Sequence, residues 1–379
     1  MCRIAKVEMA RYDYETMGEF KFLKPGPDGK VRRPSIVLRI QDDEGYVGYG
    51  QAVPLPTWAY ETPETVEVTL RHYLGPALIG RDPNRIDELH QLMNTVVRPG
   101  FTVGHPMCKA AVDLACYDLV GKRRGLSASQ LLGGAKRDSI TLSWTVNSAN
   151  METVEAQLEE GKRKGYCNFN IKVGAPQDPE YDLKLAKLVR RFAPDGFLWA
   201  DANMGYTDDT ALEMAPKLAD AGVDVLESPL PPNRLRGYQA LKRQGALPII
   251  MDEGVMSPVE AEEFAALGLM DGIAMKPART AGLWGSRRIV EIMQERGLMV
   301  LGSGLTDPDL SLMGAVHLYA WAGIEHPCAL NGPQFLAATL AAEASKMQID
   351  GGVLRVPHGP GLGMEIDVSL LQFETIAEG

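Results

Sequence analysis

Short apolar runs that each end in an ionisable residue recur through the middle of the chain at a nearly constant interval. The residues that end these runs are, in order, Lys172, Asp201, Glu227, Asp252 and Lys276. Successive members lie 29, 26, 25 and 24 residues apart. Because a barrel of parallel strands and helices devotes roughly 30 residues to each of its eight units, the repeat predicts consecutive βα units.

The segments around this row favour a modified (β/α) TIM barrel over residues 138–350. The strands are short and continuously apolar, as in a parallel sheet that is covered on both faces. Counting from a strand at 139–146, about eight strands are expected. A doubly wound open sheet is the alternative, but it would want a glycine-rich phosphate turn after its first strand, and none is present there. The helical patterns span 151–165, 179–192, 207–221, 234–244, 258–267, 282–296 and 309–322.

Residues 1–130 differ in pattern and are expected to form an α+β domain. The patterns predict strands at 3–12 and 35–52 and helices at 63–74, 85–96 and 106–124. One stripe of helix 106–124 carries small apolar residues, which predicts close packing against another helix. Segment 351–367 is predicted to be a β-ribbon that returns to the first domain, so that 351–379 forms a third part.

Two irregular segments interrupt the first domain, at 14–33 and 52–62. They are rich in glycine and proline, and the second carries Trp58 and Tyr60. Loops of this length inside a compact domain are often lids or binding loops, and an ordinary solvated loop is the alternative.

Charge and cysteine usage limit the classes of protein to consider. The 379-residue chain has a formal net charge of −10, whereas nucleic acid or an anionic membrane would require a basic face. No apolar run reaches the length of about 18 residues that a spanning helix needs, and the N-terminus lacks the pattern of a signal peptide. The five cysteines have no Cys-x-x-Cys spacing, which favours free, mostly buried thiols in a reducing compartment. A cytoplasmic location is therefore expected.

The carboxyl ends of all strands in a parallel barrel open onto one face, so the five ionisable residues should converge at one mouth. Three carboxylates there, Asp201, Glu227 and Asp252, would repel one another without a cation. Hard oxygen ligands favour Mg²⁺, with Mn²⁺ as an alternative. No histidine falls at a clear strand end, which argues against zinc.

Lys172 and Lys276 lie on strands at either side of these acids. A lysine beside a divalent cation loses its proton more readily and can act as a base, and two lysines can reach both faces of one carbon. This arrangement suits removal of a proton next to a carboxylate, with the metal stabilising the enediolate. Taken singly, each residue is more often a helix cap, a turn residue or a surface charge; only the spaced set of five indicates a site.

Five short motifs follow one another along the chain: Asn170-Ile171-Lys172-Val173-Gly174, Asp201-Ala202-Asn203, Glu227-Ser228-Pro229, Asp252-Glu253-Gly254 and Lys276-Pro277-Ala278-Arg279-Thr280-Ala281-Gly282. Together they resemble the enolase superfamily, in particular its mandelate racemase / muconate lactonising enzyme branch, over nearly the whole chain. The resemblance implies an N-terminal capping domain, loops at 14–33 and 52–62 that set specificity, and a homo-oligomer. It also implies that the three acids bind Mg²⁺, which holds a small carboxylate substrate, and that the two lysines are the acid and the base.

The sequence departs from that family at one important position. Relatives commonly have Lys-x-Lys on the second strand, whereas Asn170 stands at the first of these positions, so a substrate carboxylate loses a cationic neighbour. The His–Asp base of the racemase type is not supported, because Lys276 occupies the sixth strand. Asp307 has the alternative role of capping the next helix. The residues expected to contact the substrate are Asn170, Asn203, Trp58, Tyr60, Thr306, Asp307 and Asn331.

Two lysines permit three reactions from one intermediate. A racemase or epimerase is expected first, because it requires both lysines to exchange protons. A cycloisomerase that closes or opens a lactone and a dehydratase are the alternatives, and a metal-binding barrel without catalytic activity is the alternative from another class. The apolar and aromatic loop residues indicate a substrate that is not densely hydroxylated.

Overall fold

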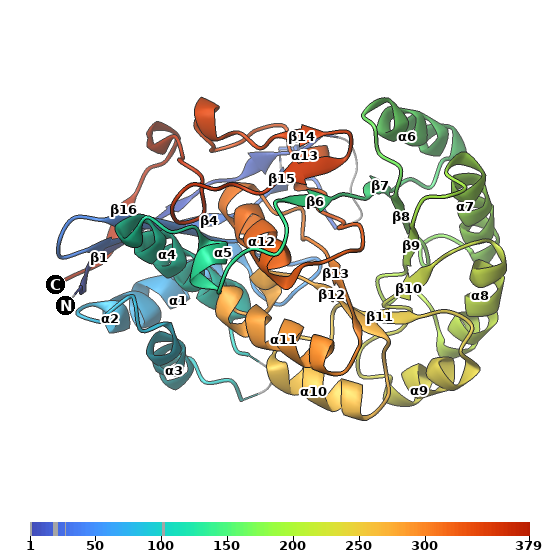
Figure 1. Ribbon diagram of the computed structural model, residues 1–379, viewed down its shortest axis with the longest axis horizontal. Coiled ribbons are helices and arrows are strands. Elements are labelled where there is room, and N and C mark those ends of the chain that lie inside the picture. Colours follow the sequence, from blue (N-terminus) through green and yellow to red (C-terminus); the bar gives the residue numbers. More distant parts are fainter. Residues whose placement is uncertain (1, 18–21, 27, 101–102) are drawn as a thin grey trace.

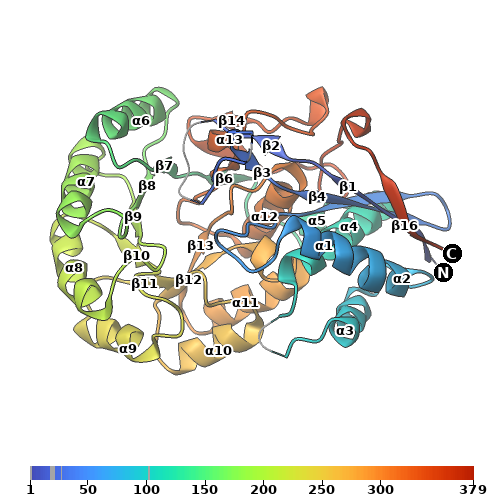
Figure 2. The ribbon, with the colours of Figure 1, turned by 180° about the vertical axis from the view of Figure 1, so that it is seen from behind.

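The computed structural model describes residues 2–17, 22–26, 28–100 and 103–379. Figure 1 shows a curled row of strands and helices on one side and a sheet with its helices on the other, with both chain ends close together at the far edge of that sheet. Figure 2 shows from behind that the strands of the curled row lie inside an arc of helices. The chain is thus an α/β barrel with an N-terminal α+β domain, as the sequence predicts.

The barrel contains seven parallel strands whose order in the sheet follows the sequence from β7 to β13. Segment 328–329 takes the eighth position through single bridges, from Cys328 to Leu142 and from Ala329 to Ser303. The strands are β7 (Trp144–Val146), β8 (Phe169–Lys172), β9 (Leu198–Asp201), β10 (Val225–Glu227), β11 (Ile249–Met251), β12 (Gly272–Met275) and β13 (Met299–Gly302).

The helices that cover the barrel begin and end within two residues of the predicted positions. Most begin at a capping residue or a proline, as in α7, which has Asp178 as its N-cap and Pro179 in its first turn, whereas α9 and α11 begin without a side-chain cap. They are α6 (Met151–Arg163), α7 (Pro179–Phe192), α8 (Asp208–Asp220), α9 (Leu235–Gln244), α10 (Pro258–Ala266), α11 (Leu283–Glu295) and α12 (Asp309–Ala322).

A separate apolar cluster fills the inside of the barrel. Its buried members are Trp199, Val225, Ile250, Ala274, Leu301 and Ala329. Side chains two positions apart on a strand point to the same face, so the residue two places further along each strand also points inward, one layer nearer the mouth. That next layer is Asp201, Glu227, Asp252, Lys276, Ser303 and Asn331.

The N-terminal domain is built on an antiparallel sheet with the strand order β16-β1-β4-β5. Its strands are β1 (Ile4–Arg11), β4 (Ile36–Asp42), β5 (Val47–Ala52) and β16 (Glu374–Glu378). Its main helices are α1 (Pro63–Thr69), the π-helical turn η1 (Leu70–Leu74), α2 (Gly75–Leu78), α3 (Ile86–Val96) and α4 (Pro106–Arg124).

The prediction that the stripe of small residues on α4 packs closely against another helix holds only in part. Leu114 on this stripe packs against Gly314 of α12, but the closest approach of the small residues is to strand β5. A Cβ atom on Gly50 would lie 2.0 Å from the carbonyl oxygen of Ala111, and one on Gly48 would lie 2.2 Å from that of Ala115. The close contact between α4 and β5 therefore depends on two glycines in the strand. The first sixteen residues of the helix are all buried.

One further prediction about a strand is wrong. Segment 139–146 is not one strand: β6 (Ser139–Thr141) pairs with β15 (Val353–Arg355), and β7 pairs with β8. Segment 351–367 is a β-ribbon only at its start, where β15 pairs with β14 (Ile349–Asp350) and with β6. Its later part contacts the N-terminal domain, because the backbone N–H of Leu362 donates to Oδ1 of Asp118 at 2.9 Å, and the later strand β16 pairs with β1. The domain boundaries at 130, 138 and 350 stay a prediction.

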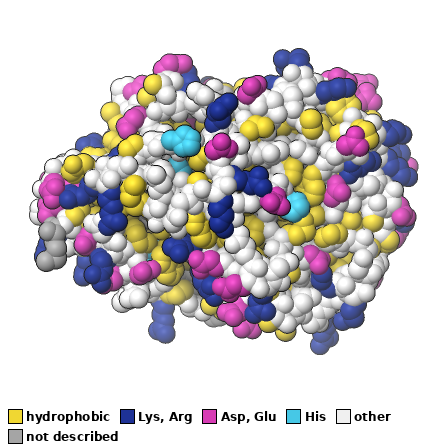
Figure 3. All heavy atoms as spheres, in the orientation of Figure 1, with side chains coloured by type: hydrophobic (Ala, Val, Ile, Leu, Met, Phe, Trp, Pro, Cys, Tyr) yellow, Lys and Arg dark blue, Asp and Glu magenta, His cyan; other side chains and the backbone are white. Residues whose placement is uncertain are grey.

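The remaining elements are short: β2 (Tyr14–Glu15), β3 (Arg32–Arg33), α5 (Ala128–Leu131), η2 (Pro277–Arg279), α13 (Gly332–Phe335), η3 (Glu343–Ser345) and η4 (Val368–Leu370). The surface face in Figure 3 has acidic and basic side chains interspersed with apolar ones. All five cysteines are free, and four of them are buried. Within the described residues, no helix has the length and hydropathy needed to cross a membrane.

Candidate active site

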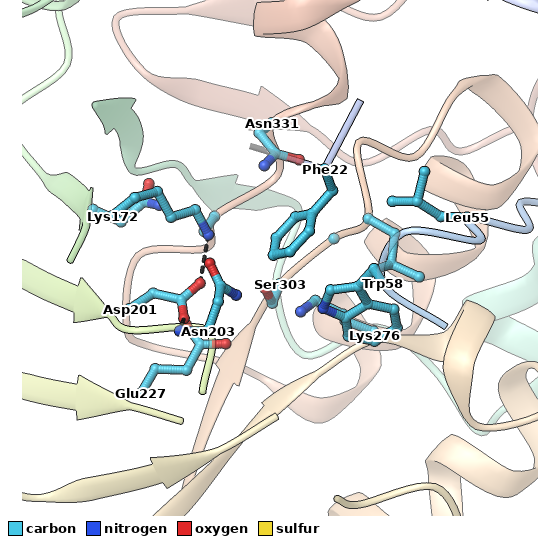
Figure 4. Close-up of a pocket in the computed structure, with 14 residues that line it drawn as sticks. Phe22, Leu55, Trp58, Lys172, Asp201, Asn203, Glu227, Lys276, Ser303 and Asn331 are labelled. Carbon is cyan, nitrogen blue, oxygen red and sulfur yellow. Dashed lines mark hydrogen bonds and ion pairs between the residues drawn. The ribbon is translucent and has the colours of Figure 1, made fainter. Parts of the chain in front are cut away.

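A cavity lies at the mouth of the barrel, between the strand ends and the N-terminal domain. In Figure 4 the ionisable residues lie around its floor, and Phe22, Leu55 and Trp58 reach in from the N-terminal domain. The lining residues are Phe22, Leu55, Trp58, Asn170, Lys172, Asp201, Asn203, Glu227, Lys276, Ser303, Gly304, Leu305, Ala329 and Asn331. The cavity therefore combines a charged floor from the barrel with an apolar roof from the other domain.

Strand register places the first three ionisable residues side by side. Asp201 is paired with Lys172 on one neighbouring strand and with Glu227 on the other. Asp252 and Lys276 directly follow β11 and β12 and are 0% and 4% exposed. The convergence predicted from the spacing is thus observed in the backbone.

The buried charges of the floor are paired in two groups. Lys172 forms an ion pair with Asp201 (Figure 4). On the opposite side, Lys276 and Arg279 both form ion pairs with Asp252. The two lysines are therefore held apart, one at each side of the cavity.

The third carboxylate, Glu227, forms no ion pair with any of the described residues, unlike Asp201 and Asp252. Burial, and then the charge of Asp201, raise the pKa of Glu227 to about 8. Its Oε1 atom is buried and accepts no hydrogen bond from the part of the chain that the structure describes. Burial also opposes ionisation of Asp201, but the charges of Lys172 and Lys276 lower its pKa below the ordinary value.

These carboxylates fit a divalent cation. Glu227 offers an unused buried oxygen, and the oxygen-only ligand set of Asp201, Glu227 and Asp252 suits a hard ion such as Mg²⁺. The ligand atoms of Asp201, Glu227 and Asp252 do not all lie within 4.8 Å of one another. Among the described residues, the one group of three acidic or thiol ligands that meets this distance is Cys2, Asp42 and Asp43, in the N-terminal domain. The protein cations Lys172, Lys276 and Arg279 compensate the acids of the floor instead.

The loops that follow β9, β10 and β13 adopt unusual backbone conformations at the mouth. Asn203, Met204, Ser228 and Thr306 have φ angles of +44°, +62°, +40° and +56°. Such left-handed conformations are uncommon for residues other than glycine and concentrate at functional sites. In this conformation the backbone N–H of Asn203 donates to Oδ1 of Asp201 at 2.9 Å.

Asn170 lies in the cavity beside Lys172 and is 2% exposed. Its Oδ1 atom accepts a hydrogen bond from Oγ1 of Thr145 at 2.9 Å. The backbone N–H of Thr145 donates to Oε1 of Gln334 at 3.0 Å, and Nε2 of Gln334 donates to the carbonyl oxygen of Thr145 at 2.7 Å. Asn170 is thus fixed at the position where the family resemblance implies a lysine.

Of the residues expected to contact the substrate, three do not line the cavity. Tyr60 is 56% exposed on the outside of its loop. Asp307 is buried and accepts hydrogen bonds from the backbone N–H of Leu305 and from Oγ of Ser311, so its oxygens stabilise the local turn. Thr306 is fully buried, and its backbone N–H donates to Asn331 at 3.0 Å. Trp58, Asn170, Asn203 and Asn331 do line the cavity.

Two residues of the site escaped the sequence analysis. Arg279 is fully buried and donates to the carbonyl oxygen of Ala274 at 2.8 Å, and burial lowers its pKa to about 10. Glu253 accepts a hydrogen bond from Nε1 of Trp58 at 3.1 Å. Both residues belong to motifs quoted above, but the sequence does not show that Arg279 pairs with Asp252 or that Glu253 contacts Trp58, because these partners lie in other segments.

Family models and curated proteins match both parts of the chain. Residues 29–133 match the N-terminal domain of mandelate racemase / muconate lactonizing enzyme, and residues 153–370 match the enolase C-terminal domain-like family. Chloromuconate cycloisomerase of Pseudomonas putida is 31% identical over 334 residues, which cover 87% of this chain and 88% of that protein. N-succinyl-L-Arg/Lys racemase of Bacillus cereus is 26% identical over 345 residues, or 90% of each protein.

Solved structures share the same architecture. The 2-chloromuconate cycloisomerase from Rhodococcus opacus 1CP has a TM-score of 0.85 and 27% identity, with 98% of each chain covered. The muconate lactonizing enzyme from Pseudomonas fluorescens, complexed with muconolactone, has a TM-score of 0.89 at 23% identity and covers 97% of this chain and 98% of that one.

Proposed function

Because the chain belongs to the mandelate racemase / muconate lactonizing enzyme family of the enolase superfamily, we propose that it is an isomerase that moves a proton at the carbon next to a substrate carboxylate. The observation that supports this most directly is the placement of Lys172 and Lys276 in one cavity that Asp201 and Glu227 also line, with Asp252 buried beside Lys276. A non-catalytic barrel would have no need to bury this many charges at one mouth.

The floor of the cavity is where a metal would be held. We propose that Asp201, Glu227 and Asp252 are its ligands, with Mg²⁺ preferred and Mn²⁺ as an alternative. When bound, a divalent cation neutralises negative charge that develops on the substrate carboxylate. Asn203 orients Asp201 through its backbone N–H, and Arg279 holds Asp252 from behind.

The lysines would carry the proton transfer. Each ammonium group is now paired with one acid, so either lysine can serve as base once it has lost its proton and as acid while it retains it. Phe22, Leu55 and Trp58 exclude water from above, which prevents loss of the proton to solvent. Asn170 would donate a neutral hydrogen bond to the substrate carboxylate.

Cycloisomerisation is the first candidate reaction, in place of the racemisation expected first from the sequence. The curated relatives named chloromuconate cycloisomerase support it, because they align over almost 90% of the chain. In that reaction one lysine exchanges a proton with the carbon next to a carboxylate, while a carbon–oxygen bond of a lactone forms or breaks.

Racemisation or epimerisation is the second candidate, because the two lysines lie on opposite sides of the cavity and one relative is named a racemase. A dehydratase would require a general acid for loss of hydroxide, a role for which the lysines line the same cavity; none of the relatives named above is a dehydratase.

Both candidates are tested by one experiment. Wild type, Lys172→Ala and Lys276→Ala are incubated with muconate, chloromuconates and N-acyl amino acids in D₂O, and NMR follows lactone formation and deuterium at the α-carbon. We expect turnover in wild type, loss of at least about 100-fold in each variant and suppression by EDTA. Equal activity of the variants and wild type would contradict the assignment of the lysines.

A further inference from the structure

Glu253 lies directly after Asp252, outside the set of cavity-lining residues, and joins two parts of the site that come from different domains. Its Oε1 atom accepts a hydrogen bond from the indole N–H of Trp58 at 3.1 Å. The same atom lies 3.5 Å from Nδ2 of Asn203, which donates to it. We propose that Glu253 is a positioning residue that fixes the roof of the cavity relative to its floor, a role that rests on the function proposed above.

The first step in this inference concerns the position of Trp58. The ammonium group of Lys276 lies over the ring of Trp58, 5.1 Å from its centre. A cation in that position is attracted by the ring face. Because Glu253 holds the indole by its N–H edge, the hydrogen bond sets where the ring lies and therefore where Lys276 can rest.

The second step concerns the floor. Asn203 has a left-handed backbone, and its N–H donates to Asp201 at 2.9 Å. Glu253 accepts from the side chain of this same residue. One carboxylate thus contacts both the residue that covers Lys276 and the residue that orients Asp201.

Apolar packing alone does not account for this arrangement. Trp58 packs on two apolar clusters, one with Leu23 and Leu55 and one with Val53 and Leu305. Such contacts would hold any aromatic ring of that size, but they do not require a carboxylate. The second oxygen of Glu253 is buried and accepts no hydrogen bond from the described residues, a cost that the contacts of the first oxygen must offset.

The proposal predicts that the loop 52–62 and the floor are coupled through Glu253. Hydrogen exchange of the backbone amides in this loop is measured for wild type, Trp58→Phe, Glu253→Ala, Glu253→Gln and the double variant Trp58→Phe/Glu253→Ala. We expect exchange about five- to tenfold faster in Trp58→Phe and Glu253→Ala. The double variant should exchange no faster than either single one, and Glu253→Gln, which can still accept from the indole, should recover part of the protection.

Tyr60→Phe is the matched control, because Tyr60 lies in the same loop with its side chain 56% exposed, and we expect unchanged exchange. Effects that add in the double variant, or unchanged exchange in Glu253→Ala, would overturn the proposal. This measurement needs no substrate, so it can fail while the proton-transfer function stands, and the reverse also holds. With a substrate in hand, Glu253→Ala should lower kcat more than it changes KM.

Discussion

The ion pair between Arg279 and Asp252 should contribute strongly to stability, and Arg279→Met tests this directly. Both side chains are 0% exposed, and Arg279 also donates to the carbonyl oxygen of Ala274. Removing one partner of a buried pair leaves an uncompensated charge, which costs about 3–5 kcal/mol. Because Lys276 remains beside Asp252, we expect the lower end, about 3 kcal/mol.

Urea unfolding of the metal-free protein at neutral pH measures the difference. Arg288→Met is the control, because Arg288 is half exposed and pairs with Glu291 and Glu295 at 3.3 and 3.1 Å on the surface; its loss should cost less than about 1 kcal/mol. Arg279→Lys keeps the charge and should fall between the two. Equal losses for Arg279→Met and Arg288→Met would refute the reasoning.

A second test of the same idea uses Mg²⁺. A ligand that binds only the folded protein stabilises it according to its concentration relative to Kd. Asp252 without its guanidinium partner is a stronger ligand for a cation, so Mg²⁺ should restore more stability to Arg279→Met than to wild type. An unchanged or smaller Mg²⁺ effect would argue against Asp252 as a metal ligand.

Three other substitutions test separate features. Burial raises the pKa of Glu227 from 4.5 to about 8, so the folded state binds this proton more tightly than the unfolded state does. The free energy of unfolding of the metal-free protein should therefore fall as the pH rises across that range, by up to about 1.4 kcal/mol per pH unit. Urea unfolding in EDTA measures this slope, and Glu227→Gln should lack the part of it that Glu227 contributes. Asn170→Lys restores a cation beside the substrate carboxylate and should tighten binding of a dicarboxylate by about tenfold in calorimetry; weaker binding would contradict the role given to Asn170. Gly50→Ala would place a Cβ 2.0 Å from the Ala111 carbonyl oxygen and should lower the free energy of unfolding by about 3 kcal/mol. Gly100→Ala, whose added Cβ meets none of the described atoms within 4 Å, should unfold like wild type.

The barrel could be predicted because its signals are local. Each strand, its cap and its helix lie within one stretch of about 30 residues, so helices such as α7 and α12 begin and end where the sequence indicates. The convergence of Lys172 to Lys276 followed from the common direction of parallel strands. Neither conclusion required knowledge of contacts between distant segments.

The errors arose where distant segments decide the outcome. Helix α4 carries an alanine-rich stripe that suits a helix or a sheet equally, and only the glycines at 48 and 50, far away in sequence, select the sheet. Strand 139–146 divides because Leu142 bonds to the segment at 352 and Ser143 to that at 328. In the site, Glu253 and Arg279 could be seen in the motifs, but their contacts with Trp58 and Asp252 depend on how the domains and loops come together.

The pairing of β1 with β16 has a consequence for synthesis on the ribosome. Strands β1, β4 and β5 precede the barrel in the chain, yet their sheet gains its outer strand from residues 374–378, which follow the barrel. Until then the barrel-facing loops are attached to a sheet whose β1 edge is unpaired, a surface on which other chains can add strands. Premature termination anywhere in the barrel would therefore leave the first domain without its outer strand and prone to aggregation.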